Sequence, residues 1–149
     1  MKIMVDTNVI LDVMLQREPF LTDSLHALDI AISENDRCLL SVSAATDIYY
    51  CLRKAVHSEK EAHNLLKRVS TFAHFTSVYT QDIENALESG ISDFEDALVD
   101  EIAFRECCDI ILTRNIADFT LSKIPAVTPT LFLKQKQNKK QHGKDFGGA

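Results

Sequence analysis

The chain has 149 residues, of which 46% are hydrophobic and 26% are charged, and its formal net charge at neutral pH is −6. This length predicts a single domain that can bury a proper core. No apolar run approaches the roughly 20 residues of a membrane span, and only three apolar residues separate Lys2 from Asp6, which excludes a signal-peptide pattern. We therefore expect a soluble, cytoplasmic protein with no membrane association.

The charge is distributed unevenly along the chain. Residues 134–145 contain five lysines and one aspartate, and the rest of the chain then carries 11 basic and 21 acidic side chains. From about Lys134 onward the lysine, glutamine and glycine content cannot form a core. We expect a folded domain over residues 1–133, followed by a basic, disordered tail over residues 134–149.

Short apolar runs alternate with helical patterns throughout this domain. The first run, Ile3–Val5, ends at Asp6, and Thr7 or Asn8 is placed to cap the helix that follows. Later strands are expected at 38–42, 75–79, 109–113 and 126–127. After a second helix through Leu25 and Ile32, further helices are expected to begin at Ser43, Ser58, Thr80, Ser92 and Pro129. This alternation is typical of a three-layer α/β/α sandwich with a mostly parallel central sheet.

Acidic and amide side chains follow the expected strands or open the helices after them. They are Asp6, Asp47, Asp93, Glu95, Asp96, Asn115 and Asp118. In a parallel sheet these positions share the carboxyl edge of the strands, where open α/β sheets bind ligands. Carboxylates gathered in one cleft repel one another unless a cation neutralises them. An all-oxygen set suits Mg²⁺ or Mn²⁺, ions that support phosphodiester cleavage, and the four cysteines have no zinc-like spacing.

Each acid also has a purely structural explanation. The positive end of a helix dipole favours acids in the first turn, which accounts for Asp47 and Asp93. Glu95 lies three residues after Ser92 and fits a capping box. Exposure to solvent is expected for Asp100 and Glu101, and is one of two alternatives for Asp12.

Four segments in order, DTNVILD, SAATDIYYCLRK, SDFEDAL and ILTRNIADF, resemble the PIN-domain family of ribonucleases, which includes the VapC-type toxins of bacterial toxin–antitoxin pairs. The resemblance extends to about residue 133. It implies a parallel α/β/α sandwich in which three or four acids bind Mg²⁺ or Mn²⁺ and cut RNA. It also implies an antitoxin that covers the cleft, and a homodimer.

The resemblance carries roles to individual positions of this chain. It implies catalytic roles for Asp6, Asp47, Asp96 and Asn115, metal binding by Asp6, Asp47, Asp96 and Asp118, and supporting roles for Asn8 and Thr113, to which we add Asp93 because it shares a helical face with Asp96. Asp47 stands where the family usually has glutamate, and Asn115 where many members have aspartate. These two departures favour one tightly held metal ion over two.

Binding of RNA by an acidic body requires local basic groups and the metal itself. Arg53, Lys54 and Arg114 are the candidates within the domain, and the lysines of the tail are a further one. No base-reading motif is present, so the sequence does not predict the RNA target.

Three other classes of function are alternatives to a metal-dependent ribonuclease. A non-catalytic PIN-like domain that binds RNA or protein is the main alternative. A phosphatase of the doubly wound class would need a second aspartate two residues after Asp6, where Asn8 stands. A Rossmann dinucleotide site would need a glycine-rich loop after the first strand, and none follows it.

Overall fold

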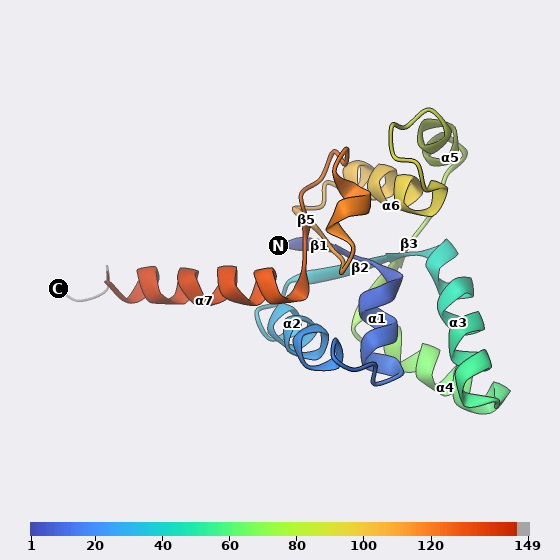
Figure 1. The fold of residues 1–149 in the computed structure, drawn as a ribbon, viewed down its shortest axis with the longest axis horizontal. Helices are drawn as coiled ribbons and strands as arrows, with labels where there is room; N and C mark the ends of the chain where they lie inside the picture. Colours follow the sequence, from blue (N-terminus) through green and yellow to red (C-terminus); the bar gives the residue numbers. More distant parts are fainter. Residues whose placement is uncertain (146–149) are drawn as a thin grey trace.

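The computed structural model describes residues 1–145, which fold as a five-stranded sheet between two layers of helices (Figure 1). The strands are β1 (Lys2–Val5), β2 (Arg37–Ser41), β3 (Ala73–Thr76), β4 (Ile110–Leu112) and β5 (Ala126–Val127). The helices are α1 (Thr7–Met14), α2 (Leu21–Ser33), α3 (Val42–Val56), α4 (Glu59–Val69), α5 (Thr80–Leu87), α6 (Phe94–Arg105), the 3₁₀ helix η1 (Ile116–Phe119) and α7 (Pro129–Asp145). All paired strands are parallel, in the order β3-β2-β1-β4-β5. The predicted α/β/α sandwich is confirmed.

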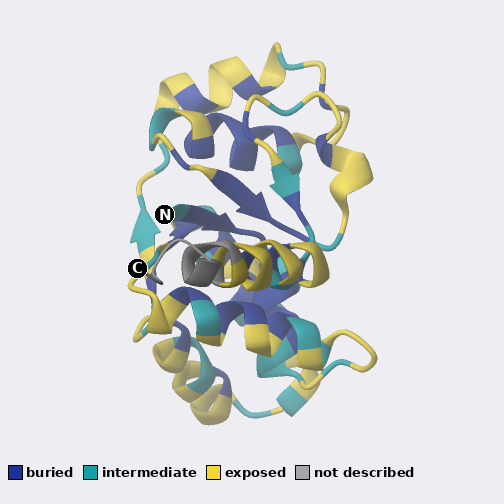
Figure 2. Cartoon of the chain, turned by 90° about the vertical axis from the view of Figure 1, so that its left-hand side faces the viewer, coloured by how far each residue is buried: buried dark blue, intermediate teal, exposed yellow. Residues whose placement is uncertain are grey.

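The strands are buried on both faces because their side chains alternate between two cores. In β1, Ile3 and Val5 belong to the core beneath α1–α4, whereas Met4 belongs to the core beneath α5 and α6. Figure 2 shows the buried strands between the two helical layers. This double burial explains why the strands are continuous apolar runs in the sequence.

The position of β1 in the middle of the sheet creates a crevice at its carboxyl end. The chain moves from β1 through β2 to β3, then returns to place β4 on the other side of β1. Because parallel crossovers are right-handed, the helices before and after this return cover opposite faces of the sheet (Figure 1). Ligands of open α/β sheets bind at such a reversal, and here Asp6 follows β1 while Thr113 follows β4.

Three helices begin at residues other than the predicted caps. Ser41 caps α3 by accepting a hydrogen bond from the Ala44 backbone N–H at 3.1 Å, so the predicted cap at Ser43 is wrong. Asp93, rather than Ser92, caps α6. Asp6 occupies the cap position of α1 without a side-chain cap bond. Short polar side chains stand side by side at each of these helix starts, and the sequence does not indicate which of them adopts the extended backbone of the cap.

The structure also differs from the expected disordered tail, because α7 continues to Asp145. Phe132 is buried in the core, and Lys136 is only 7% exposed. The Lys136 Nζ donates to Glu34 Oε2 at 2.6 Å and to Asp36 Oδ2 at 2.5 Å. The composition of the segment concealed this anchor, because the acidic partners lie about a hundred positions earlier. Residues 146–149 of the predicted tail lie outside the described residues.

No helix within residues 1–145 combines the length and the apolar character that a membrane span needs.

Lys136 provides a test of this anchor. Removing it in Lys136→Ala leaves the nearly buried Asp36 carboxylate without this ammonium partner, and we expect a loss of about 2 kcal/mol in the free energy of unfolding, measured by urea denaturation. Lys134→Ala, an exposed lysine on the same helix, is the control and should change it by less than about 0.5 kcal/mol. Equal effects of the two substitutions would show that Lys136 does not hold α7.

Candidate functional site

Asp6 is held rigidly at the carboxyl end of β1. It is 9% exposed, and its Oδ2 accepts hydrogen bonds from Asn8 Nδ2 and from Thr113 Oγ1, both at 2.6 Å. Burial raises the pKa of Asp6, and the Thr113 hydroxyl and the backbone N–H groups of Thr7 and Asn8 oppose this shift. The carboxylate is therefore fixed in one orientation by groups from two neighbouring elements of the fold.

The same two elements are joined by further hydrogen bonds. Asn8 Oδ1 accepts from the Arg114 backbone N–H at 3.2 Å, and Asn8 Nδ2 also donates to Thr113 Oγ1 at 3.3 Å. Asn8 thus uses its amide NH₂ on Asp6 and its oxygen on the segment after β4. The DTN and TRN segments form one hydrogen-bonded unit beneath the cleft.

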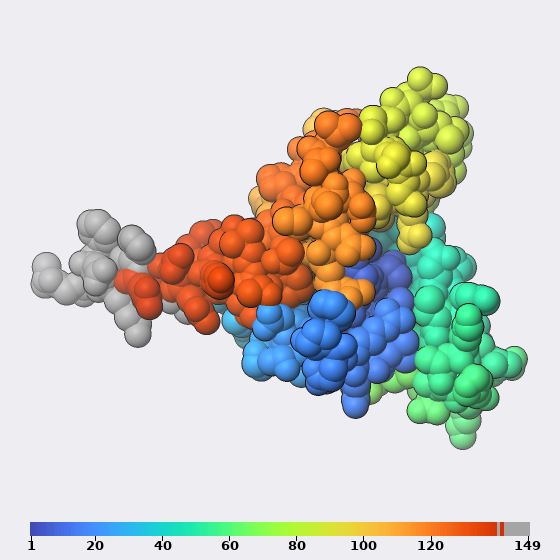
Figure 3. Space-filling model, viewed as in Figure 1, coloured from blue at the N-terminus to red at the C-terminus, as the bar shows by residue number. Residues whose placement is uncertain are grey.

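A cleft opens above this unit, between the start of α1, the start of α6 and η1. Its walls carry the acids Asp6, Asp93, Glu95, Asp96 and Asp118, together with Thr7, Asn8, Leu11, Arg17 and Asn115. Figure 3 shows the three parts of the chain that border the cleft: the blue N-terminal residues, the yellow residues at the start of α6 and the orange segment after β4. Five carboxylates from three elements therefore face one solvent-filled space.

Burial and mutual repulsion both raise the pKa values of acids that line the cleft. Burial raises the pKa of Asp96 to about 7, and the neighbouring carboxylates, led by Asp6 and Asp93, push it in the same direction. The pKa of Glu95 is raised by burial and then by Asp47 and Asp6. A cation bound in the cleft would relieve this repulsion.

The donor set fits a hard divalent cation that retains part of its water shell. Carboxylate and amide oxygens are the ligands that such ions prefer. Within residues 1–145, no three His, Cys, Asp or Glu side chains are close enough together to hold an ion by themselves. Mg²⁺ usually takes one or two carboxylates and completes its octahedron with water and substrate oxygens, so this arrangement suits it.

Most of the predicted site residues are brought together by the fold. Those that line the cleft are Asp6, Asn8, Asp93, Asp96, Asn115 and Asp118, and Thr113 lies buried beneath them. Asp47 is outside this lining: it is exposed and lies in the second turn of α3, because the helix begins at Val42. Its charge still acts on Glu95 across the rim of the cleft.

The three predicted RNA-binding residues lie outside the cleft lining. Arg53 and Lys54 occupy the last turn of α3, where Arg53 Nη2 lies 3.4 Å from Glu59 Oε1. The Arg114 side chain contacts Asp12, with Nε 3.1 Å from Oδ2. The cleft contains a different basic residue, Arg17.

Two cleft residues were missed by the sequence reasoning. Glu95 was assigned to a capping box with Ser92, but Asp93 is the cap and accepts from the Glu95 and Asp96 backbone N–H groups at 2.9 and 3.2 Å. Reading Asp93 as the cap would have left the Glu95 side chain free for the cleft. No sequence signal marked Arg17.

Solvent exposure is the wrong expectation for Asp100 and Glu101, and the wrong one of the two alternatives for Asp12. Asp12 is completely buried and accepts from Ser24 Oγ at 3.1 Å. Asp100 accepts from the Lys123 backbone N–H at 3.0 Å, and Glu101 pairs with the Lys123 ammonium at 2.5 Å. All three acids have partners more than ten positions away, which helical spacing does not reveal.

Comparison with known proteins agrees with this fold. The family model of the PIN domain matches residues 2–117. The chain therefore belongs to the PIN domain family.

Particular relatives are VapC proteins. The chain is 29% identical over 119 residues to Ribonuclease VapC1 of Aquifex aeolicus (strain VF5), covering 76% of this chain and 81% of the relative. The fold is shared with VapBC2 from Rickettsia felis, solved bound to a DNA fragment from its promoter (TM-score 0.70, 14% identity, 86% of this chain and 98% of that one). It is also shared with Mycobacterium tuberculosis VapC20, a Sarcin-Ricin loop cleaving toxin (TM-score 0.64, 14% identity, 83% and 98%).

The raised pKa of Asp96 makes the stability of the fold depend on pH. The unfolded carboxyl loses its proton near its ordinary value of 3.8, whereas the folded one keeps it until about pH 7. The protonated Asp96 carboxyl therefore stabilises the folded state fully below a pH of 3.8, and this contribution is lost as the pH rises from 3.8 to about 7. With a chelator present, we expect Asp96→Asn to gain about 1 kcal/mol over wild type at pH 8, after allowing for solvent screening, and nothing at pH 4.

Thermal unfolding at the two pH values measures this difference. Asp29→Asn, at an exposed acid of α2, is the matched control and should have no effect at either pH. A gain for Asp96→Asn that is the same at pH 4 and pH 8 would contradict the assigned titration.

Proposed function

We propose that this protein is a divalent-metal-dependent endoribonuclease of the VapC type, the toxin of a toxin–antitoxin pair. The observation that carries the proposal is the cluster of five carboxylates in the cleft, Asp6 among them, with the pKa of Asp96 raised to about 7. The relative from Aquifex aeolicus is named a ribonuclease, and VapC20 is described as a Sarcin-Ricin loop cleaving toxin. Both descriptions agree with chemistry at a phosphodiester.

The cation we assign to this cleft is Mg²⁺ or Mn²⁺. Asp6 and Asp96 would hold it directly and Asp118 would contribute through water, with Asn115 beside them and the remaining positions open to water and to phosphate oxygens. When bound, such an ion polarises the phosphoryl oxygen and lowers the pKa of a water molecule. We keep Asp47 as a contributor at the rim of the cleft, where its charge acts on Glu95.

The residues of the chain supply orientation and proton transfer. Asn8 and Thr113 fix Oδ2 of Asp6, which leaves the other carboxylate oxygen to face the cleft. Glu95 has a raised pKa and is placed to accept a proton from a water molecule in the cleft. Arg17 also lines the cleft and provides positive charge that attracts the RNA backbone.

The proposed partners are RNA, an antitoxin protein and a second copy of the chain. A solved structure with the same fold is named a toxin–antitoxin complex, from Klebsiella pneumoniae. An antitoxin that places a basic side chain in the cleft would neutralise the same carboxylates as the metal. We place the protein in the cytoplasm, where RNA and such a partner are found.

A non-catalytic RNA- or protein-binding domain is the second candidate function. The observation in its favour is that the cleft lacks two acids that the family pattern would place there, since Asn115 replaces an aspartate and Asp47 lies at the rim. Metal affinity separates the two functions, because a scaffold has no need to bind Mn²⁺ tightly.

Substitution of the two central acids tests the nuclease directly. Asp6→Asn and Asp96→Asn each remove a carboxylate that stabilises the cation and the reacting phosphate, and we expect at least a 100-fold (~10²) loss in the rate of RNA cleavage. The measurement is cleavage of a mixed RNA pool by wild type and both variants in Mg²⁺, in Mn²⁺ and in EDTA.

Asp29→Asn serves as the control and should cut as fast as wild type, since the residue is exposed on α2. Cutting by Asp6→Asn at the wild-type rate would refute the assigned site. If no RNA is cut by wild type, calorimetric titration with Mn²⁺ decides between a selective enzyme, which binds the ion, and a scaffold, which does not.

Thr113 tests whether the support beneath Asp6 matters for the metal. Thr113→Val keeps the shape of this buried side chain but loses the hydroxyl that donates to Asp6 Oδ2. We expect Mn²⁺ affinity to fall roughly 10-fold, while Thr113→Ser retains the wild-type affinity. Equal affinities of the valine and serine variants in calorimetry would show that this hydrogen bond does not tune the site.

A further inference from the structure

A second cavity lies beside the acidic cleft and has no role in the function proposed above. Its volume is about 190 Å³, and its lining includes Pro19, Phe20, Asp23, Arg114, Thr128 and Pro129. These residues come from the link between α1 and α2, from the start of α2, from the loop after β4 and from the start of α7. Typical small-molecule sites begin at roughly 300 Å³, so this cavity has room for one planar ring and not for a whole cofactor.

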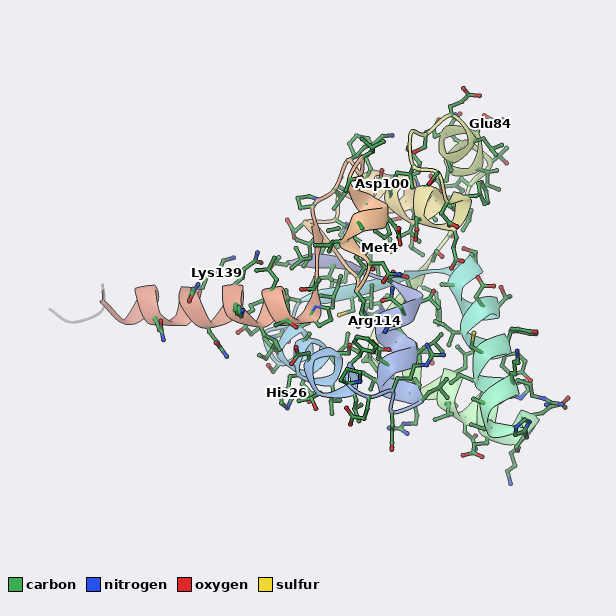
Figure 4. All side chains as sticks on the ribbon, viewed as in Figure 1. Met4, His26, Glu84, Asp100, Arg114 and Lys139 are labelled. Carbon is green, nitrogen blue, oxygen red and sulfur yellow. The ribbon has the colours of Figure 1, made fainter. Side chains whose placement is uncertain are left out.

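Arg114 forms the wall between this cavity and the cleft. Its backbone N–H donates to Asn8 in the floor of the cleft, and Asn115, the next residue, lines the cleft itself. Its side chain turns the other way and lines the cavity. Figure 4 shows Arg114 at the centre of the molecule, between the segment after β4 and helices α1 and α2. The cleft and the cavity therefore adjoin each other, because Asn115 and Arg114, which are consecutive in the chain, line one each.

The cavity presents a flat, fixed platform made by Arg114 and Phe20. The Arg114 guanidinium carbon lies 4.1 Å from the centroid of the Phe20 ring, and Phe20 keeps 42% of its surface exposed. Asp12 holds the guanidinium through Nε, and Ser24 holds Asp12. The guanidinium therefore lies over the Phe20 ring and is paired with Asp12 before any ligand arrives.

This arrangement is poorly explained by stability alone. Asp12 Oδ1 and Arg114 Nε are buried and, among the residues that the structure describes, neither has a partner with hydrogen-bond geometry. Burying an incompletely bonded ion pair commonly costs more in desolvation than the attraction returns. The pair fixes the direction of the guanidinium, which is what a stacking surface requires.

We propose that this cavity binds one nucleobase of a single-stranded RNA, next to the phosphate held in the acidic cleft. Proteins recognise unstacked RNA bases by stacking them on aromatic rings and on arginine planes. The Thr128 hydroxyl accepts from the Leu131 backbone N–H and still has its own proton to donate to the edge of a base. This inference rests on the proposed function, because the cleft supplies the site for the adjoining phosphate.

The chain contains no tryptophan, so a single indole placed in the cavity is a direct reporter of stacking. Phe20→Trp should keep the platform, and its fluorescence should fall when short mixed-sequence RNA is added in Mg²⁺, read immediately after mixing. An oligomer of the same length and charge that lacks bases should leave the fluorescence unchanged and bind roughly 10-fold more weakly.

The matched control is Phe104→Trp. Phe104 is also an exposed phenylalanine beneath a cation, with Lys123 Nζ 5.1 Å from its ring centroid, but it lies on α6 away from the cavity. Its fluorescence should not respond to RNA. Equal quenching at the two positions, quenching of Phe20→Trp by the abasic oligomer, or no quenching by any RNA would each overturn the subsite.

A second variant separates this inference from the nuclease activity. Phe20→Ala should bind Mn²⁺ as wild type does, yet lose the roughly 10-fold preference for the oligomer that carries bases. Base-dependent quenching without RNA cleavage would refute the nuclease and support the subsite. If the Phe20→Ala protein cuts RNA and still prefers the oligomer that carries bases as strongly as wild type does, the subsite is refuted and the nuclease is supported.

Discussion

The site depends on the pair of hydrogen bonds that hold Oδ2 of Asp6. One donor, Asn8, lies in the first turn of α1, and the other, Thr113, lies at the end of β4. The two donors also tie the segments to each other, since Asn8 Oδ1 accepts from the Arg114 backbone N–H and Asn8 Nδ2 donates to Thr113 Oγ1. The cleft is therefore assembled by the reversal of strand order at β1, which places these two segments next to each other.

The acids around Asp6 are held together against their own repulsion. The fold achieves this by fixing each at a helix or strand end, as with Asp93, whose carboxylate caps α6 and whose charge raises the pKa of Asp96. Such a site is least stable when metal-free at high pH, when its carboxylates are ionised. Ligand binding and fold stability are consequently linked, since a cation that binds only the folded cleft also stabilises it.

The sequence predicted the fold and most of the cleft because both depend on local patterns. Short apolar runs that end in Asp6 or Thr113 indicate strand ends, and parallel topology brings those ends together. Contacts between distant segments were not accessible in this way. The burial of Asp12 depends on Arg114, and the order of α7 depends on the contact of Lys136 with Asp36, about a hundred residues apart in each case.

The anchoring of α7 has a consequence for the electric field of the molecule. Asp36, which binds Lys136, immediately precedes β2 and so lies at the amino edge of the sheet, opposite the acidic cleft. The lysine-bearing helix projects from that edge (Figures 1 and 4). Positive and negative charge are thereby separated along the strand direction, which gives the protein a permanent dipole. At distances within a Debye length of about 10 Å at moderate salt, a polyanion would turn α7 toward itself before its phosphates entered the cleft.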